Sequence, residues 1–272
     1  MDSLNDHQFE QLRRKAYALW GLDVKSHKRE MVQGRLRKLV VSGQADSLAS
    51  LVAALDAGVG DPLSMEVFDA LSTNMTSFFR ENDHFDCVRD ELLEPLLASG
   101  RRRPLRFWSA ACSKGCEPYS LAMLLRDTLS DIDSWDVKIL ASDLARSVVD
   151  HGRRGIYEAS WVEGLDPKLV ERHFIRGKGA HSDKFRVTPE LSRLVTFALV
   201  NLNGPWVHKG LFDVIFCRNV MIYFDEPTRE KLVGRLQDML KPGGLLIVGS
   251  SEALNQPPVS LTRVRPAVYR AA

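Results

Sequence analysis

Small and polar residues follow three buried strand candidates, at the points where those strands end. The loop over 109–120 reads SAACSKGCEPYS, Asp143 ends the second candidate, and Arg218 with Asn219 follows the third. In open α/β sheets, ligands bind at the carboxyl ends of the strands, near the point where the strand order reverses. Small side chains also let a ligand lie against backbone N–H groups and a helix N-terminus. The loop has no G-x-G-x-x-G pattern, so dinucleotide binding is not indicated.

Two carboxylates beside this loop each have two interpretations. Asp143 suits the two hydroxyls of an adenosine ribose, or it caps the helix that follows. Glu117 lies just before Pro118, where an anion complements the helix dipole. It therefore either caps that helix or faces a cation or hydroxyl of a ligand. The small-residue loop is equally compatible with tight packing of a strand against a helix.

Two segments that mix polar and aromatic residues lie near the same predicted edge. Residues 73–80 read TNMTSFFR and join a helical region to the sheet. They form either a simple hinge or a segment that closes a ligand site, since ligand sites favour domain interfaces. Residues 216–224 read FCRNVMIYF, and Tyr223 within them is as readily a core residue as a functional one.

The spacing of apolar residues divides the chain into a helical part and an alternating part. The first 71 residues show only helical spacing, beginning with the stripe of Phe9, Leu12, Ala16 and Leu19. Asp61 and Pro62 are predicted as the N-cap and first-turn proline of the last of these helices. Further on, predicted strands alternate with predicted helices, the last of them capped by Asp225. The predicted strands are 105–111, 137–142, 212–217 and 245–249, and the helices between and after them are 118–129, 145–151 and 226–239. This alternation predicts an α/β fold with a parallel, doubly wound sheet.

The stretch from 155 to 202 interrupts the alternation and is interpreted as an inserted antiparallel β-subdomain. It contains a helix at 167–173 and strand-like FRV and LVTFALV runs. The predicted organisation is an N-terminal α-helical domain over 1–72 and a sheet domain over 73–272. Within the latter, 73–90 is the linker and 155–200 the inserted subdomain.

The charge balance and the cysteines restrict the classes of protein to consider. The 272 residues include 37 Lys and Arg against 35 Asp and Glu, a formal net charge of +2, which argues against bulk nucleic-acid binding. No apolar run approaches the roughly 18 residues that cross a bilayer, and the first residues lack a signal-peptide core. We therefore expect a cytoplasmic chain without membrane insertion. The four cysteines are expected as buried thiols rather than disulfides or metal ligands.

These segments together resemble the chemotaxis-receptor glutamate O-methyltransferases, the CheR-type family. The likeness follows the family's order and covers nearly the whole chain, including the N-terminal helical region. It is carried by TNMTSFFR at 73–80, HF at 84–85, FWSAACSKGCEPYS at 107–120, ASD at 141–143, GIY at 155–157, NL at 201–202, FDVIFCRNVMIYFD at 212–225 and LKPGG at 240–244.

The resemblance implies S-adenosylmethionine as methyl donor, S-adenosylhomocysteine as product and a receptor glutamate as acceptor. It implies that Arg80 and Tyr223 are the polar groups nearest the methyl transfer. The cofactor-binding residues that it implies are Asn74, Thr76, Arg80, Glu117, Asp143, Asn201, Leu202, Arg218 and Asn219. The inserted subdomain would dock the C-terminal tail of a receptor. Apart from the resemblance, we expect a monomer. Two residues depart from the family pattern: Cys116 replaces a common acid, and Ser250 a common histidine.

A basic helix is the second informative place. Six Lys or Arg and one acid lie between Lys25 and Val40, whereas 41–71 holds five acids and no Lys or Arg. Lys28, Arg35 and Lys38 lie on one side of the apolar stripe. They form either a solvated helix face or, given the resemblance, a docking face for the acidic helical bundle of a receptor.

The expected chemistry needs no general base. A glutamate with a reference pKa of about 4.3 is already ionised at neutral pH, and the sequence has no obvious Ser/His/Asp or Cys/His arrangement. The enzyme must align the reacting atoms and exclude water. The alternatives are an adaptor with a degenerate cofactor site and a methyltransferase of this fold that acts on another protein.

Overall fold

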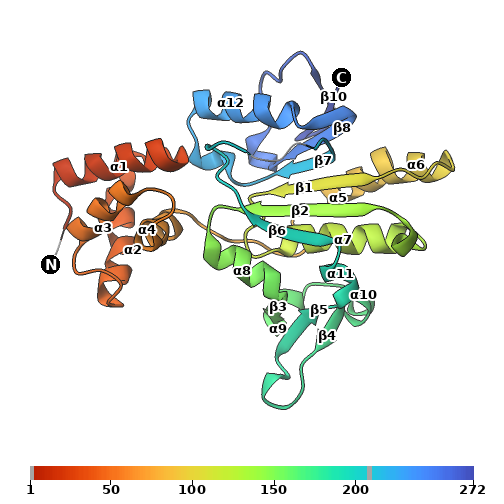
Figure 1. The fold of residues 1–272 in the computed structure, drawn as a ribbon, viewed down its shortest axis with the longest axis horizontal. Coiled ribbons are helices and arrows are strands. Elements are labelled where there is room, and N and C mark those ends of the chain that lie inside the picture. The colour runs from red at the N-terminus through yellow and green to blue at the C-terminus, as the bar shows by residue number, and fades with distance from the viewer. Residues whose placement is uncertain (1–2, 207–209) are drawn as a thin grey trace. The chain divides into compact units, whose positions relative to one another are not determined.

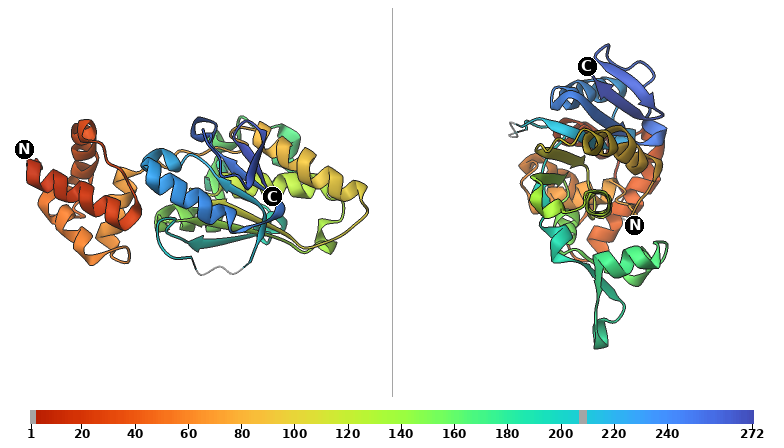
Figure 2. Two further views of the ribbon diagram at one scale, coloured as in Figure 1. Left: turned by 90° about the horizontal axis from the view of Figure 1, so that it is seen from above. Right: turned by 90° about the vertical axis from the view of Figure 1, so that its right-hand side faces the viewer.

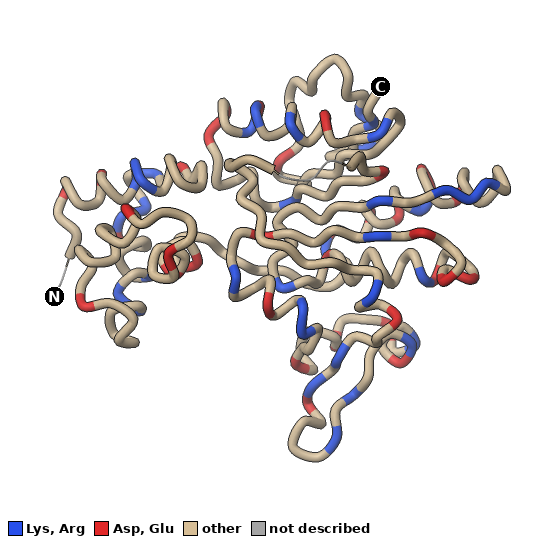
Figure 3. The backbone as a smooth tube through the Cα atoms, viewed as in Figure 1, with Lys and Arg blue, Asp and Glu red and all other residues tan. Residues whose placement is uncertain are grey.

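The computed structural model describes residues 3–206 and 210–272 and divides the chain into two compact units. The helical unit comprises Met1–Asn74, Asn201–Trp206 and Val220–Leu232, and the sheet unit comprises Met75–Val200, Val207–Asn219 and Val233–Ala272. Two short segments that the sequence analysis assigned to the sheet domain therefore pack with the helices. Figure 1 shows the elements of both units, and Figure 3 shows acidic and basic residues interspersed along each.

Four helices form the core of the helical unit, and their ends follow from the local sequence. They are α1 (Asp6–Trp20), α2 (Arg29–Val41), α3 (Leu48–Ala54) and α4 (Pro62–Leu71). The Asp61 side chain accepts from the Ser64 N–H at 2.7 Å, and Pro62 is the first helical residue, so this predicted N-cap is confirmed.

The apolar stripe of α1 ends on a different residue from the one predicted. Phe9, Leu12, Ala16 and Trp20 are the buried residues of α1. Leu19 is only partly buried, and Trp20 takes its place against Phe68 with ring centroids 5.2 Å apart. Spacings of three and four residues keep the four buried residues on one face of the helix. The long indole of Trp20 reaches the core from the last turn, whereas Leu19 lies beside this face.

The sheet unit contains a seven-stranded mixed sheet in the order β6-β2-β1-β7-β8-β10-β9. Its strands are β1 (Leu105–Ala110), β2 (Val137–Asp143), β6 (Val195–Leu199), β7 (Phe212–Cys217), β8 (Leu240–Val248), β9 (Leu261–Arg265) and β10 (Val268–Ala271). The first five in the order are parallel, as predicted for the doubly wound part. The strand order reverses between β1 and β7, which places the switch point there.

Helices join these strands and surround the sheet. They are α5 (Asp83–Val88), α6 (Glu94–Ala98), α7 (Cys116–Thr128), α8 (Arg146–Arg154), α9 (Ala159–Val162), α10 (Pro167–His173), α11 (Pro189–Ser192) and α12 (Glu226–Gln237). Both α7 and α8 pack against β2 and β6. The Asp225 carboxylate accepts from the Thr228 N–H at 3.1 Å, so the predicted cap of α12 is confirmed.

The inserted subdomain is smaller than predicted. A three-stranded antiparallel sheet in the order β3-β5-β4 comprises β3 (Ile156–Glu158), β4 (Phe174–Arg176) and β5 (Lys184–Val187), and it lies apart from the main sheet (Figure 2). The LVTFALV run was predicted to belong to it, but β6 instead pairs in parallel with β2. As the edge strand of the main sheet, β6 has buried and exposed residues in alternation at its start. An antiparallel strand with one solvated face shows the same pattern, so the run itself does not identify its sheet.

Two further features of the main sheet were not predicted. The antiparallel strands β9 and β10 complete its edge beyond β8. The strand predicted over 245–249 begins earlier, because the LKPGG segment forms the start of β8, with an irregularity in the β7–β8 register beside it.

The described helices include no single one that is long and apolar enough to span a membrane. Two consecutive helical segments, Leu48–Ala57 and Pro62–Leu71, are long and apolar enough only when taken together, and the chain bends by 116° between them.

Candidate active site

The loop that follows β1 at the switch point has an unusual backbone. Ala111, Ser113 and Gly115 have φ values of 70°, 48° and 90°. Left-handed backbone is uncommon outside glycine and is concentrated at functional sites. The Ser113 N–H donates to the Asp143 carboxylate at 2.9 Å, and the Cys112 N–H donates to the Ser142 carbonyl at 2.8 Å. The ends of β1 and β2 are thereby joined directly.

Glu117 lies in the first turn of α7, but its side chain does not cap that helix. One carboxylate oxygen accepts from the Ser109 hydroxyl at 2.7 Å, and the other from the Arg218 guanidinium at 3.0 Å. The side chain is 13% exposed. Burial raises the pKa of Glu117 above its ordinary value, although Arg218 and Ser109 act in the opposite direction. Of the two interpretations, the arrangement favours a carboxylate that belongs to the site.

Arg218 is the central charge of this edge. Its side chain is 2% exposed. It donates to Glu117 and, at 2.5 Å, to the backbone carbonyl of Arg80, and it lies 3.4 Å from the Glu81 carboxylate. Its Nε has no acceptor among the described residues. Since a buried donor left without an acceptor costs free energy, a ligand or water acceptor at this nitrogen fits the site.

Asp143 joins two loops but does not cap the helix that follows. Besides Ser113, it accepts from the Ala145 N–H at 3.1 Å. Ala145 is itself the N-cap residue of α8, which has no side-chain cap among the described residues. Asp143 is 8% exposed. A carboxylate oxygen accepts more than one donor, so these two bonds leave room for a ligand hydroxyl.

The linker contributes Thr76 and Arg80 to the sheet unit. The Thr76 hydroxyl is hydrogen-bonded to the Cys116 thiol. The Arg80 side chain is 41% exposed, donates to the Met75 carbonyl at 3.1 Å and lies 3.8 Å from the Glu81 carboxylate.

Several polar residues of this edge were missed by the sequence analysis. Glu252 is buried and accepts from the Asn219 N–H at 2.6 Å and the Gly249 N–H at 3.0 Å. Glu81 accepts from the N–H and the hydroxyl of Ser250 at 2.9 and 2.6 Å. Burial alone would raise the pKa of Glu81, but Ser250 and Arg218 outweigh it and lower the pKa to about 2. Available signals were the position of Glu81 beside Arg80 and of Glu252 just beyond the end of β8.

The structure thus brings Thr76, Arg80, Glu117, Asp143, Arg218 and Asn219 into the sheet unit. The other four predicted site residues, Asn74, Asn201, Leu202 and Tyr223, belong to the helical unit.

In the helical unit, Tyr223 and Asn201 bond to the backbone. The Tyr223 hydroxyl accepts from the Thr73 N–H at 3.1 Å and donates to the Thr73 carbonyl at 3.2 Å. The Asn201 side chain donates to the Leu19 carbonyl at 2.8 Å and accepts from the Asn203 N–H at 3.0 Å. These contacts fix the start of the linker and the turn at 201–204.

The three predicted docking residues differ in their surroundings. Lys28, in a short 3₁₀ turn before α2, and Lys38, within α2, are both exposed. Arg35 is partly buried and donates to three carbonyls at the end of α4 and to the Thr73 hydroxyl. These distances are 3.3 Å to Ala70, 3.2 Å to Leu71, 3.1 Å to Ser72 and 3.0 Å to Thr73. Arg35 therefore caps the C-terminus of α4, as a cation there is expected to do.

The four cysteines are free and buried, which confirms their predicted packing. Burial raises the pKa of Cys116 to about 12 and that of Cys112 well above its ordinary value. Both thiols beside the site are therefore neutral at physiological pH and are not nucleophiles. In the described part of the chain, no three His, Cys, Asp or Glu side chains are grouped as metal ligands.

A small-residue loop, two carboxylates and a buried guanidinium gather at the carboxyl ends of the parallel strands, which is where α/β proteins bind their ligands. Two family models identify the chain further: the CheR methyltransferase SAM-binding domain matches residues 74–268, and the CheR methyltransferase all-alpha domain matches residues 7–72. The chain belongs to the CheR methyltransferase family.

Curated relatives agree over most of the chain. Chemotaxis protein methyltransferase 2 of Pseudomonas aeruginosa is 41% identical, covering 90% of this chain and 85% of its own. The chemotaxis protein methyltransferase of Klebsiella aerogenes is 41% identical, and the match covers 93% of this chain and 85% of that protein. The chemotaxis protein methyltransferase of Escherichia coli is 39% identical, and the match covers 92% of this chain and 85% of that protein. The chain is thus a methyltransferase of the chemotaxis type.

Proposed function

We propose that this enzyme transfers a methyl group from S-adenosylmethionine to glutamate side chains of chemoreceptors and forms glutamyl methyl esters. The observation that carries the proposal is the buried pair of Glu117 and Arg218 at the switch point, beside Asp143, in a chain of the CheR family. S-adenosylhomocysteine is the expected product. The receptor helices that carry the acceptor glutamates imply a cytoplasmic enzyme.

The residues of this edge fit the donor by their chemistry. The donor carries an ammonium, a carboxylate and a ribose diol, and each has a matching group. The Glu117 carboxylate suits the ammonium, the unpaired Nε of Arg218 suits the carboxylate, and Asp143 suits the diol. When bound, S-adenosylmethionine supplies an electrophilic methyl group on a sulfonium centre.

Acidic residues of the edge also outnumber its cations. Glu81 and Glu117 lie within 3.4 and 3.0 Å of the Arg218 guanidinium, and Arg80 lies 3.8 Å from Glu81. Two further acids, Asp143 and Glu252, accept from backbone N–H groups. Such an excess of negative charge favours binding of S-adenosylmethionine, whose sulfur is positively charged, over S-adenosylhomocysteine, whose sulfur is uncharged. After transfer, the product is therefore readily replaced by fresh donor. We propose the remaining predicted residues, Asn74, Thr76, Asn201, Leu202 and Asn219, as further cofactor contacts.

The chain's own task in the reaction is positioning. The acceptor glutamate is ionised at neutral pH. Because Cys112 and Cys116 are neutral thiols, we propose that neither forms a covalent intermediate and that the methyl group passes directly from donor to acceptor. We propose that Arg80 holds a carboxylate of the donor or acceptor, and that Tyr223 orients the acceptor. Because the Tyr223 hydroxyl also bonds to Thr73, Tyr223→Phe is expected to loosen the linker as well.

We further propose that α2 docks on the acidic helical bundle of the receptor. Lys28 and Lys38 carry this proposal because both are exposed, whereas Arg35 acts mainly as the cap of α4. Docking by exposed charges predicts a receptor KM that rises steeply with salt.

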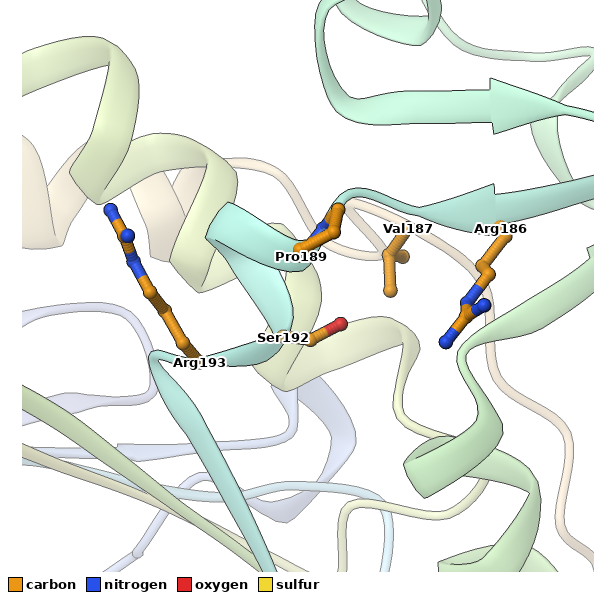
Figure 4. A pocket seen from close by; sticks show the side chains of 5 residues that line it. All are labelled: Arg186, Val187, Pro189, Ser192 and Arg193. Carbon is orange, nitrogen blue, oxygen red and sulfur yellow. The ribbon is translucent and has the colours of Figure 1, made fainter.

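For the inserted subdomain, we propose that it docks the C-terminal tail of a receptor. Ile156, Arg186 and Ile175 are paired across its three strands and are all exposed. A hollow of about 370 Å³ adjoins this row (Figure 4), lined by Arg186, Val187, Pro189, Ser192 and Arg193. An apolar and acidic extended tail would match the row, and fluorescence anisotropy of a labelled tail peptide with Arg186→Glu tests this.

The experiment for the main proposal is transfer of a tritiated methyl group from S-adenosylmethionine to receptor-rich membranes, followed by base. Methyl esters release labelled methanol, and this release is the expected result. Calorimetry with S-adenosylhomocysteine decides the alternative: an adaptor with a degenerate site gives no binding heat. Arg80→Ala and Tyr223→Phe are expected to lower turnover, and wild-type turnover in both would exclude their assigned roles.

A further inference from the structure

The linker reaches the site through two strained residues that flank Arg80. Phe79 has a φ of 51° and Glu81 a φ of 55°. A left-handed conformation is rare for a bulky residue such as phenylalanine. Residues held in such conformations persist only where their surroundings fix them. The segment 79–81 therefore needs contacts that hold it in place.

Three contacts from separate elements hold this segment. The Phe79 N–H donates to the Ser120 hydroxyl of α7 at 2.9 Å. The Arg80 carbonyl accepts from Arg218, beyond β7, at 2.5 Å. The Glu81 carboxylate accepts both the N–H and the hydroxyl of Ser250, beyond β8, at 2.9 and 2.6 Å.

The Arg80 side chain contributes little to its own position. It is 41% exposed, with one hydrogen bond to the Met75 carbonyl at 3.1 Å and the Glu81 carboxylate 3.8 Å away. Its direction is therefore set by the backbone on either side and by the charge of Glu81. Two of the three contacts are made by ionised groups, the Arg218 guanidinium and the Glu81 carboxylate, and charge-assisted hydrogen bonds are the stronger kind. Of these two, the Glu81 carboxylate accepts two donors, both from Ser250.

We propose that Glu81 and Ser250 form a latch that positions Arg80 for methyl transfer. Glu81 and Ser250 are positioning residues: they act through Arg80 and need not touch donor or acceptor. The inference rests on the proposed function because Arg80 is assigned there to the reacting groups.

The ionised state of Glu81 supports the latch. Burial favours the neutral acid, but Ser250 and Arg218 lower its pKa to about 2. The carboxylate thus accepts both Ser250 donors throughout the physiological pH range. His84 lies 3.5 Å from the same carboxylate, and the Asn219 side chain donates to it at 3.4 Å.

The test is a double-mutant cycle on the full-length enzyme. Glu81→Ala is expected to lower kcat about tenfold, since a small misplacement of a positioning group costs one to two powers of ten, while the receptor KM stays unchanged. In an Arg80→Ala background, Glu81→Ala is expected to cause no further loss. An equal loss in both backgrounds would overturn the latch.

Ser250 supplies a milder variant and its own controls. Ser250→Ala removes the hydroxyl and keeps the N–H, so a smaller loss is expected, and Ser250→Thr should restore turnover. The neighbouring exposed Ser251→Ala is the matched control and should behave as wild type. Loss in the threonine variant equal to that in the alanine variant would contradict the assignment.

Hydrogen exchange separates the latch from the proposed function. With no receptor present, Glu81→Ala and Ser250→Ala should speed amide exchange in the peptide that contains 79–81 and leave β1 and β7 unchanged. Unchanged exchange at 79–81 overturns the latch whatever the activity. Absence of methyl transfer in the wild type, with faster exchange in the variants, would instead refute the proposed function alone.

Discussion

Replacement of Arg218 by methionine tests the electrostatic centre of the site. Methionine keeps most of the buried stem but removes the guanidinium, which donates to Glu117 and to the Arg80 carbonyl. Glu117 then keeps only the Ser109 hydroxyl as a partner. The variant loses two hydrogen bonds that involve a charged group, and each contributes about 1.5–3 kcal/mol to the free energy of unfolding. Their sum is similar to the roughly 3–5 kcal/mol that is lost when one partner of a buried ion pair is removed. We expect the free energy of unfolding to fall by about this amount at pH 8.

The loss should depend on pH with a definite sign. Burial already raises the pKa of Glu117, and removal of Arg218 raises it further. The folded variant then binds a proton more tightly than the unfolded chain, whose glutamates titrate near 4.3, so its stability falls as pH rises through the folded pKa. Arg218 also helps to lower the pKa of Glu81, so its removal shifts the pKa of Glu81 upward too, in the same direction as that of Glu117. The destabilisation should therefore be smaller at about pH 5 than at pH 8.

Urea titrations at the two pH values measure the effect. Glu117→Gln in the Arg218→Met background removes the stranded charge, so the double variant should be more stable than Arg218→Met alone at pH 8. Similar urea m-values would show that the unfolded states are comparable. Equal destabilisation at both pH values, or a double variant no more stable than the single one, would refute the account of this pair.

Other predictions concern docking, packing and the thiols. Lys28→Ala with Lys38→Ala should raise the receptor KM and reduce its salt dependence, with kcat and S-adenosylhomocysteine affinity unchanged; an effect on kcat alone would contradict docking. Gly152→Ala should destabilise the sheet unit by about 1–3 kcal/mol, because the new Cβ would lie 2.4 Å from the Phe197 ring. Gly234→Ala is the matched control: its Cβ would have no atom within 4 Å, and alanine favours the helix, so this variant should stabilise α12. Thermal melts measure both changes. The four buried thiols should react with a thiol reagent slowly in the native enzyme and fully in urea, since burial raises their pKa values; rapid native labelling would contradict their burial.

Local sequence signals predicted the parts of the fold that depend on local physics. The strands β1, β2 and β7 are mostly apolar, each with one charged residue near its start. The caps at Asp61 and Asp225 are side-chain to backbone bonds within one turn. Which sheet the LVTFALV run joins depends on pairing between strands that are distant in sequence, so its pairing with β2 could not be predicted from the neighbouring residues. The β9–β10 hairpin was missed because its strands are short and carry arginines, and because most of β9 is not buried.

The site shows the same division between local and long-range information. Glu117, Asp143 and Arg218 could be found because each lies at the end of a recognisable strand or the start of a helix. Glu81 and Ser250 could not, since their contact joins residues 169 positions apart. Arg35 was predicted from its charge as a docking residue, but its guanidinium bonds to the carbonyls at the end of α4, a contact that helical periodicity does not reveal.

The central claim is that this chain esterifies receptor glutamates, and mass spectrometry of a purified chemoreceptor tests it most directly. After incubation with the enzyme and S-adenosylmethionine, we predict that receptor peptides gain the mass of one methylene per site, on glutamate side chains, and lose it as methanol in mild base. Asp143→Ala enzyme, with an impaired donor site, should give little of this modification. No mass gain on any receptor glutamate, or a gain that survives base, would contradict the account.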